Sequence, residues 1–343
     1  MSVTMETNPG IDPEADGPVT DEVRGVRRKA RAARFAQQQG ALVVLVLLVV
    51  VMSFAYPTFA SAASFSQIAL QASFLAIVAL GMTLVIFTGG IDLSVGSVFA
   101  LGGVVAAWAS QYGVVAAIVL PLVVCGAIGL VQGLIIARGG LPPFIVTLAG
   151  LLFARGLLLF VTDEGSVTNK VPTGSAFLRL ARSELFGVRY TVWLVVVLVL
   201  VGVLVQTRTT YGATLLAIGS QEEAAVLMGM PVDRVKVMTY VVSGMCAGLA
   251  GLLTASYTAS GVTTLGVGME LTAISAVVLG GTLLTGGAGS VVGTVVGVLL
   301  LQVIANLINR LGLTDSNWQA VTSGAVLLVV ATSQQLLRRA QRV

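Results

Sequence analysis

Histidine is absent from this chain of 343 residues, and charged residues make up only 10% of it. Soluble domains carry about 25% charged residues, so the chain lacks the charge that covers a water-soluble surface. Hydrophobic residues account for 56% of the sequence and fall in blocks of membrane-spanning length. The composition therefore excludes a soluble globular protein and predicts an all-α, polytopic helical membrane protein.

The chain is equally poor in residues that carry chemistry. Without histidine it lacks the commonest general base and metal ligand. Its two cysteines, Cys125 and Cys246, lie inside apolar runs and are interpreted as small packing residues. A phosphate-binding loop needs a Gly-Lys-Ser/Thr sequence, and none of the three lysines follows a glycine. We therefore expect no catalytic, cofactor or metal site, and any ATP that drives this protein must be hydrolysed on another chain.

The amino-terminal region divides by charge. Residues 1–23 hold six acids and no base, and residues 24–34 hold six bases. We predict a disordered acidic, then basic, cytoplasmic tail over residues 1–40, whose bases flank a membrane anchor rather than bind nucleic acid. Ala60-Ser61-Ala62 has the form of a signal-peptide cleavage site, but the preceding apolar run is longer than a signal core, which favours an uncleaved anchor.

Hydropathy and charge predict the topology. Ten apolar segments within a permease domain over residues 41–335 are each close to the length that crosses a bilayer. With the amino terminus in the cytoplasm, 13 bases fall on the cytoplasmic side and five on the other, which predicts that both termini are cytoplasmic, including the basic residues 336–343. The predicted spans are 41–59, 66–88, 93–110, 114–137, 144–161, 191–206, 237–258, 269–284, 288–309 and 318–334.

One pattern occurs twice. Leu-Gly-x-Thr-Leu, then Thr-Gly-Gly, then Val-Gly-x-Val occupies residues 80–98 and recurs over residues 279–295. Transporters are often built from two related halves, so the pattern predicts an internal repeat, with parallel copies because they lie six spans apart. Inverted copies and chance similarity are the alternatives. The glycine-rich pairs 66–110 and 269–309 could instead contain broken or re-entrant helices.

Few ionisable residues fall in or beside the predicted spans, and burying their charge costs several kcal/mol. Asp92 could cap the helix that begins near Leu93, or it could line a passage, and the two roles are compatible. Glu270 is expected at the outer membrane surface, with a buried site as the alternative. Arg155 is expected to pair with a carboxylate or with helix-end carbonyls. The candidate residues for a passage or a structural role are Gly89, Gly90, Asp92, Ser94 and Glu270.

A cytoplasmic loop over residues 207–236 contains Glu223-Ala224-Ala225, followed by Gly229 and Pro231. This order predicts a short helix with a small, flat face, which Gly229 ends and Pro231 prevents from continuing. Such a helix is suited to dock in a cleft of a soluble partner. An ordinary connection between two helices is the simpler alternative.

Several stretches together resemble the permease subunits of bacterial ABC importers for monosaccharides, over residues 65–335. They are GMTLVIFTGGIDLSVGSVFALGG (81–103), GGLPPFIVTLAGLLFARGL (139–157), the loop at 219–236 and GMELTAISAVVLGGTLLTGGAGSVVGTVVG (268–297). The strings GTLLTGG and LMGMPV look most like a galactofuranose-type importer. The alternatives are a self-sufficient secondary sugar transporter, an ABC permease for another small polar solute such as a branched-chain amino acid, and an intramembrane enzyme.

The resemblance implies a multi-subunit importer in the inner, cytoplasmic membrane. Two permeases would pair, as identical or related chains, above two ATPase subunits that bind ATP and magnesium. An extracytoplasmic sugar-binding protein would deliver the sugar. The loop would contain the coupling helix that receives ATP-driven movement, and its expected contact residues are Glu222, Glu223, Ala224, Ala225 and Gly229.

Replacing Gly229 with a bulky residue, as in Gly229→Leu, should uncouple ATP hydrolysis from uptake while leaving the protein in the membrane. The reason is that the residue ends the helix expected to contact the ATPase. ATP hydrolysis and sugar uptake by the assembled importer measure the effect, and normal uptake would contradict the assignment of the coupling helix.

Overall fold

The computed structural model describes residues 40–312 and, beyond them, Trp318, Val321, Gly324, Ala325, Leu328 and Thr332. The predicted tail, the carboxy-terminal segment 336–343 and most of the predicted span 318–334 lie outside the described residues. Within residues 40–312, each of the nine remaining predicted segments contains an apolar helix, so the expectation of a polytopic all-α protein is confirmed.

Seven of the described helices are long and apolar enough to cross a membrane. Two apolar helices are shorter, Gly40–Ala55 and α11 (Met269–Leu279). The seven are α2 (Ala62–Phe87), α3 with η1 (Val95–Tyr112), α4 (Val114–Gly139), α5 (Pro143–Val161), α7 (Tyr190–Arg208), α10 (Val232–Thr258) and α12 (Val291–Arg310). The connecting elements are η2 (Ala176–Leu178), α6 (Arg179–Arg182), β1 (Glu184–Leu185), β2 (Val188–Arg189), α8 (Thr210–Ser220) and α9 (Glu222–Leu227).

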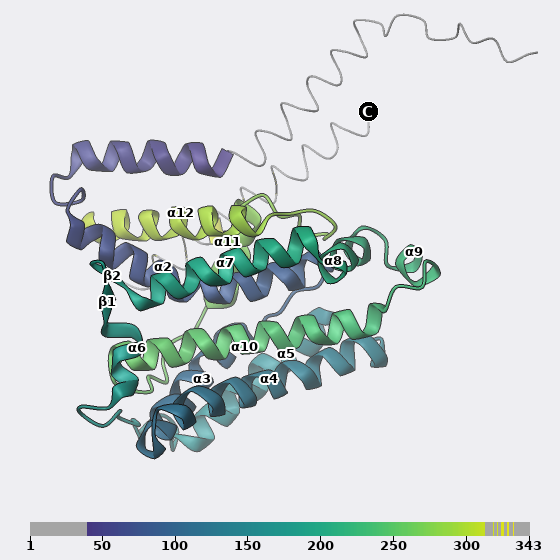
Figure 1. The fold of residues 1–343 in the computed structure, drawn as a ribbon, viewed down its shortest axis with the longest axis horizontal. Coiled ribbons are helices and arrows are strands. Elements are labelled where there is room, and N and C mark those ends of the chain that lie inside the picture. Colours follow the sequence, from purple (N-terminus) through teal and green to yellow (C-terminus); the bar gives the residue numbers. More distant parts are fainter. Residues whose placement is uncertain are drawn as a thin grey trace, which may run out of the picture.

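Helix α10 is the central element of the bundle, with α2, α7, α11 and α12 on one side of it and α3, α4 and α5 on the other (Figure 1). Glycines allow its close packing. A Cβ atom on Gly244 would overlap the carbonyl oxygen of Cys125 in α4, and one on Gly251 would overlap that of Phe99 in α3. Cys125 is a buried free thiol against this face, which agrees with its interpretation as a packing residue. Small residues at membrane helix contacts allow backbones to approach and gain dispersion energy.

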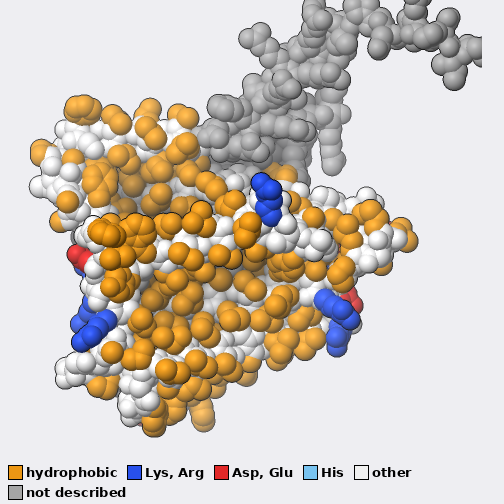
Figure 2. Space-filling model, in the orientation of Figure 1, with side chains coloured by type: hydrophobic (Ala, Val, Ile, Leu, Met, Phe, Trp, Pro, Cys, Tyr) orange, Lys and Arg blue, Asp and Glu red, His pale blue; other side chains and the backbone are white. Residues whose placement is uncertain are grey.

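Apolar side chains cover the middle of the molecule, and most charged side chains in this view lie toward the two ends of its long axis (Figure 2). One end carries α8, α9 and the start of α10, and the other carries α6 and the β1–β2 hairpin (Figure 1). This apolar belt with polar ends is what a bilayer requires. The protein is therefore a multi-pass membrane protein, and the side that each end faces stays a prediction.

The two copies of the sequence pattern occupy equivalent places, each at a turn between two helices. The first covers the end of α2 and the start of α3, and the second covers the end of α11 and the start of α12. Thr83 and Thr294 share a hydroxyl hydrogen bond of 2.8 Å near the end of α2 and the start of α12. At the opposite ends of these helices, Arg310 donates to Ser64. Thus α12 runs antiparallel to both α2 and α11, and the two copies run in parallel.

The second copy departs from a simple pair of spans. Helix α11 has 11 residues, which at about 1.5 Å per residue extend about 16 Å, roughly half of a hydrocarbon core of ~30 Å. Residues 280–290, which follow it, form turns and extended backbone before α12 begins. The predicted span 269–284 is therefore a short helix followed by irregular backbone, in line with the broken-helix alternative.

Gly251→Val should destabilise the fold by about 1–3 kcal/mol or more, because the new side chain meets the α3 backbone, which cannot move aside as a flexible side chain can. Thermal unfolding of the detergent-solubilised chain measures the effect. Gly156→Val on α5 is the matched control, since a Cβ atom there meets no atom within 4 Å in the described part of the chain. Equal stability of the two variants would contradict this account of α10 packing.

Candidate functional site

Helix α9 projects at one end of the molecule, beyond the main bundle (Figure 1). Gln221 has extended backbone angles, φ −163° and ψ 101°, which separate α9 from α8. After Leu227 the chain turns through Gly229, whose φ is +74°, and the N–H of Met230 donates to the carbonyl of Ala225 at 3.1 Å. The short helix expected before Gly229 is therefore present, and a left-handed residue ends it.

The residues of α9 divide into an inward and an outward set. Ala225 is fully buried and packs beneath the helix. Glu222 forms an ion pair of 2.6 Å with Lys236 on α10, which ties the start of α9 to the next helix. Glu223 is exposed and Ala224 is half-buried. Of the expected contact residues, Glu222 and Ala225 thus hold the helix in place, and Glu223, Ala224 and Gly229 are open to a partner.

Sequence reasoning missed the apolar tip of this helix, formed by Val226, Leu227 and Met228. All three side chains are exposed, and Leu227 is 88% exposed. A group of exposed apolar residues marks a candidate site of interaction with another protein or with the membrane. The helical period of 3.6 residues could have found them, because it separates Ala225 from the face that carries Glu223 and Leu227.

The carboxy-terminal end of α8, at Gly219, lies directly against both copies of the repeated pattern. A Cβ atom on Gly219 would overlap the carbonyl oxygen of Phe87, at the end of α2, and the N–H of Gly287. The same N–H of Gly287 donates to the carbonyl of Phe87 at 3.1 Å. A displacement of α8 and α9 would therefore press at once on the turn after α2 and on the turn before α12.

Asp92 lies at the start of α3 with 1% of its surface exposed. One carboxylate oxygen, Oδ1, accepts from the backbone N–H of Ser94 at 3.0 Å and from its hydroxyl at 2.6 Å. The other, Oδ2, accepts from the hydroxyl of Ser243 on α10 at 2.7 Å. The carboxylate thus accepts a hydrogen bond from the backbone N–H of Ser94, just before the first residue of α3, and ties this helix start to α10. This arrangement supports the structural role expected for Asp92.

The glycines before Asp92 allow a tight turn. Gly89 has a φ of +77° and faces the carbonyl of Thr285, from the turn that follows α11. A Cβ atom on Gly90 would lie 2.5 Å from the hydroxyl oxygen of Tyr240. Both positions therefore exclude larger residues. Neither Gly89 nor Gly90 lines one of the two large grooves described below, so their assignment to a passage stays a prediction.

Arg155 on α5 donates to the backbone carbonyls of Thr263 at 2.9 Å and Leu265 at 3.3 Å. These carbonyls belong to the loop between α10 and α11, so Arg155 binds loop carbonyls and not the helix-end carbonyls that the sequence analysis expected. Glu270 attracts the guanidinium electrostatically. Glu270 itself is half-buried in the first turn of α11, between the exposed and the buried positions that the sequence left open.

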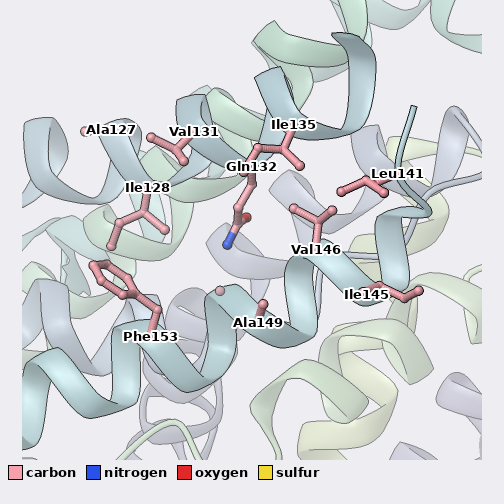
Figure 3. Close-up of a pocket in the computed structure, with 11 residues that line it drawn as sticks. Ala127, Ile128, Val131, Gln132, Ile135, Leu141, Ile145, Val146, Ala149 and Phe153 are labelled. Carbon is pink, nitrogen blue, oxygen red and sulfur yellow. The ribbon is translucent and has the colours of Figure 1, made fainter. Parts of the chain in front are cut away.

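In the described part of the chain, two large grooves open between helices. The first lies between α4 and α5, has a volume of about 570 Å³ and contains Gln132 (Figure 3). The second lies among α2, α7, α8 and α10, with a volume of about 440 Å³. Side chains lining both are predominantly apolar, and neither groove is a polar channel through the bundle. Among the described residues, no group of three or more Cys, Asp or Glu side chains is placed to hold a metal ion.

Comparison with known proteins links this architecture to membrane import. The sequence model of a family described as branched-chain amino acid transport system / permease component matches residues 64–331. The ribose import permease proteins of Bacillus subtilis and Escherichia coli K12 are each 37% identical over 313 residues, which covers 90% of this chain and 96% and 97% of theirs. The L-arabinose ABC transporter permease protein of Azospirillum brasilense is 32% identical over 335 residues, 97% of each chain. No solved structure matches the chain significantly.

Asp92→Ala should lower the free energy of unfolding by about 1–3 kcal/mol, because it removes the acceptor of the buried Ser243 hydroxyl and of the backbone N–H of Ser94. Thermal unfolding in detergent and the yield of folded protein report the change. Glu184→Ala, at an exposed carboxylate in β1, is the control and should leave both unchanged. Normal stability of Asp92→Ala combined with reduced transport would instead assign Asp92 to the passage.

Proposed function

Because this chain belongs to the family described as branched-chain amino acid transport system / permease component, we propose from its relatives and its geometry which subunit it forms and what it transports. It is the membrane-spanning permease subunit of an ABC importer that moves a monosaccharide across the cytoplasmic membrane. The observation that carries the proposal is the similarity, over at least 90% of the chain, to permeases whose names specify ribose and arabinose.

In this proposal, ATP hydrolysis on partner subunits supplies the energy for transport. ATP and magnesium bind to separate ATPase subunits, which contact the end of the permease that carries α8 and α9. This end is cytoplasmic, and so are both termini, in line with the distribution of bases along the sequence. A sugar-binding protein contacts the opposite end, which carries α6 and the β1–β2 hairpin. Two permease chains pair, as identical or related copies.

The apolar tip of α9 suits the ATPase contact. Val226, Leu227 and Met228 would enter an apolar cleft of the ATPase, with Glu223 at its rim. Movement of that cleft would pass through Gly219 at the base of α8 to the turns at Phe87 and Gly287. Both turns lead into bundle helices, so closure of the ATPase subunits would shift α2 and α12 together.

The hydrogen bonding of the charged side chains within the bundle favours a sugar over an amino acid as the substrate. A zwitterionic amino acid needs counter-charges, whereas a sugar needs uncharged hydrogen-bonding groups and apolar surface. Asp92 is engaged by serine hydroxyls and Arg155 by backbone carbonyls, so neither presents a free charge to an amino acid. The description of the family names amino acids, which makes this solute the second candidate.

Purification of the tagged chain in mild detergent, with mass spectrometry of the co-purifying proteins, tests the assembly. Recovery of an ATPase, together with ATP-dependent uptake of ribose or arabinose by the complex, is the expected result. Uptake of leucine, isoleucine or valine in place of sugar would support the second candidate. Recovery of the chain alone, able to move sugar in vesicles without ATP, would indicate a self-sufficient carrier and contradict the proposal.

Leu227→Asp should weaken the association with the ATPase about tenfold or more, since it places a charge at the centre of an apolar contact. Binding of the purified ATPase to the permease in nanodiscs measures the loss. Phe186→Asp is the control, because Phe186 is 89% exposed, compared with 88% for Leu227, and lies in the β1–β2 turn at the opposite end. Equal ATPase affinity of both variants would remove α9 from the interface.

A further inference from the structure

Gln132 is a polar residue in the membrane-spanning part of α4, with 4% of its surface exposed. One end of its amide, Oε1, lies 3.2 Å from the hydroxyl oxygen of Ser94. The other end, Nε2, is buried and has no hydrogen-bond partner among the described residues. A buried polar group without a partner is unfavourable, and more so where lipid replaces water. The free end of this amide is therefore the unusual feature.

The free end faces the groove between α4 and α5. Figure 3 shows the Gln132 side chain extending from α4 into the space between the helices, with the nitrogen at its tip. Ile128, Val146 and Phe153 surround this space and give it apolar walls. Opposite the amide lies Gly150 of α5, where a Cβ atom would overlap Nε2. The absence of a side chain at Gly150 thus leaves room for the amide at the floor of the groove.

The second large groove differs in this respect. The hydroxyl-bearing residues that line it are Thr209 and Tyr211, and both hydroxyls are engaged. The hydroxyl of Thr209 donates to the carbonyl of Val205 at 2.6 Å, and the hydroxyl of Tyr211 shares a bond of 2.8 Å with that of Thr239. Lipid chains can fill such a groove with no loss of hydrogen bonding. Of these two grooves, only the one between α4 and α5 is lined by an amide with an unused end.

Neighbouring residues hold the amide in its orientation. The hydroxyl of Ser94 contacts both Asp92, at 2.6 Å, and Gln132, and Asp92 is in turn bound by Ser243 of α10. This chain of contacts anchors one end of the amide and directs the other end into the groove. A sugar hydroxyl both donates and accepts, so it can pair with whichever amide atom faces the groove, whereas a lipid ester oxygen only accepts.

We propose that the groove between α4 and α5 forms part of the sugar route and that the Gln132 amide hydrogen-bonds a hydroxyl group of the passing sugar. This inference rests on the proposed function, and it names a residue that contacts the substrate. The groove volume of about 570 Å³ lies within the range of small-molecule sites. Phe153 and the aliphatic walls would face the C–H groups of the sugar, and Gln132 would select for a hydroxyl at one position. Ser94 and Asp92 act as positioning residues.

The test measures ATP-dependent uptake by cells that express the complete importer. The probes are radiolabelled D-ribose and L-arabinose and the singly deoxygenated analogues of whichever sugar is taken up. Gln132→Leu should reduce uptake of the fully hydroxylated sugar about fivefold to tenfold, as expected for the loss of one hydrogen bond. Uptake of one deoxygenated analogue, which lacks the partner hydroxyl, should be the same for the parent chain and Gln132→Leu.

Gln206→Leu is the matched control, because both ends of the Gln206 amide already have partners. Its Nε2 donates to the carbonyl of Gly289 at 2.8 Å, and its Oε1 accepts from the N–H of Val291 at 3.1 Å. This variant should lower the amount of folded protein without changing the relative uptake of the analogues. Uptake is therefore normalised to the amount of permease in the membrane for every variant.

Each remaining outcome overturns a defined part of the argument. A Gln132→Leu variant that takes up every sugar at the parent rate would show that the Gln132 amide does not bind the passing sugar, and would overturn the proposal. An equal reduction for all sugars would reduce Gln132 to a structural role. Absence of ATP-dependent sugar uptake by the parent chain would overturn the proposed function, and this inference with it.

Discussion

Close approach of helix backbones around α10 is the constraint on which the rest of the structure depends. Within a bilayer, no hydrophobic effect drives one apolar helix against another, so association depends on dispersion contacts and interhelical hydrogen bonds. Glycines at Gly244, Gly248 and Gly251 bring α10 against the backbones of α3 and α4. This packing brings Ser243 to Asp92, so the region around Asp92 rests on it.

Polar groups in the bundle are used as anchors between elements that are distant in sequence. Arg155 ties α5 to the segment before α11, and Gln206 ties α7 to the start of α12. Asp92 ties the start of α3 to α10. Each of these groups is engaged by partners that remove the cost of burial. Gln132 is a glutamine like Gln206, but one end of its amide has no partner among the described residues. This difference makes Gln132 a candidate contact for a solute that carries hydroxyl groups.

The repeated pattern explains why one short helix could influence the whole bundle. Both copies place glycines at a turn, and the two turns contact each other through Gly89, Thr285 and Gly286. Gly219 lies against the same junction. Since the glycines at this junction have no side chain, backbone contacts backbone directly, and little side-chain motion is available to absorb a displacement. Such a junction suits the transfer of movement from a soluble partner to membrane helices.

Local sequence was enough to predict the class of the protein, the apolar helices within residues 40–312 and the short helix before Gly229. These features depend on local composition: long apolar runs, the absence of histidine and a glycine followed by proline. The family also followed from motifs contiguous in the chain. Tertiary contacts were needed to reveal the hydrogen-bond partners of Asp92, the length of α11, the outward face of α9 and the unused amide end of Gln132. Each of these features depends on contacts between atoms from segments that are distant in the sequence. Hydropathy does not predict such contacts, because it is the same for a buried polar residue that has a hydrogen-bond partner and for one that has none.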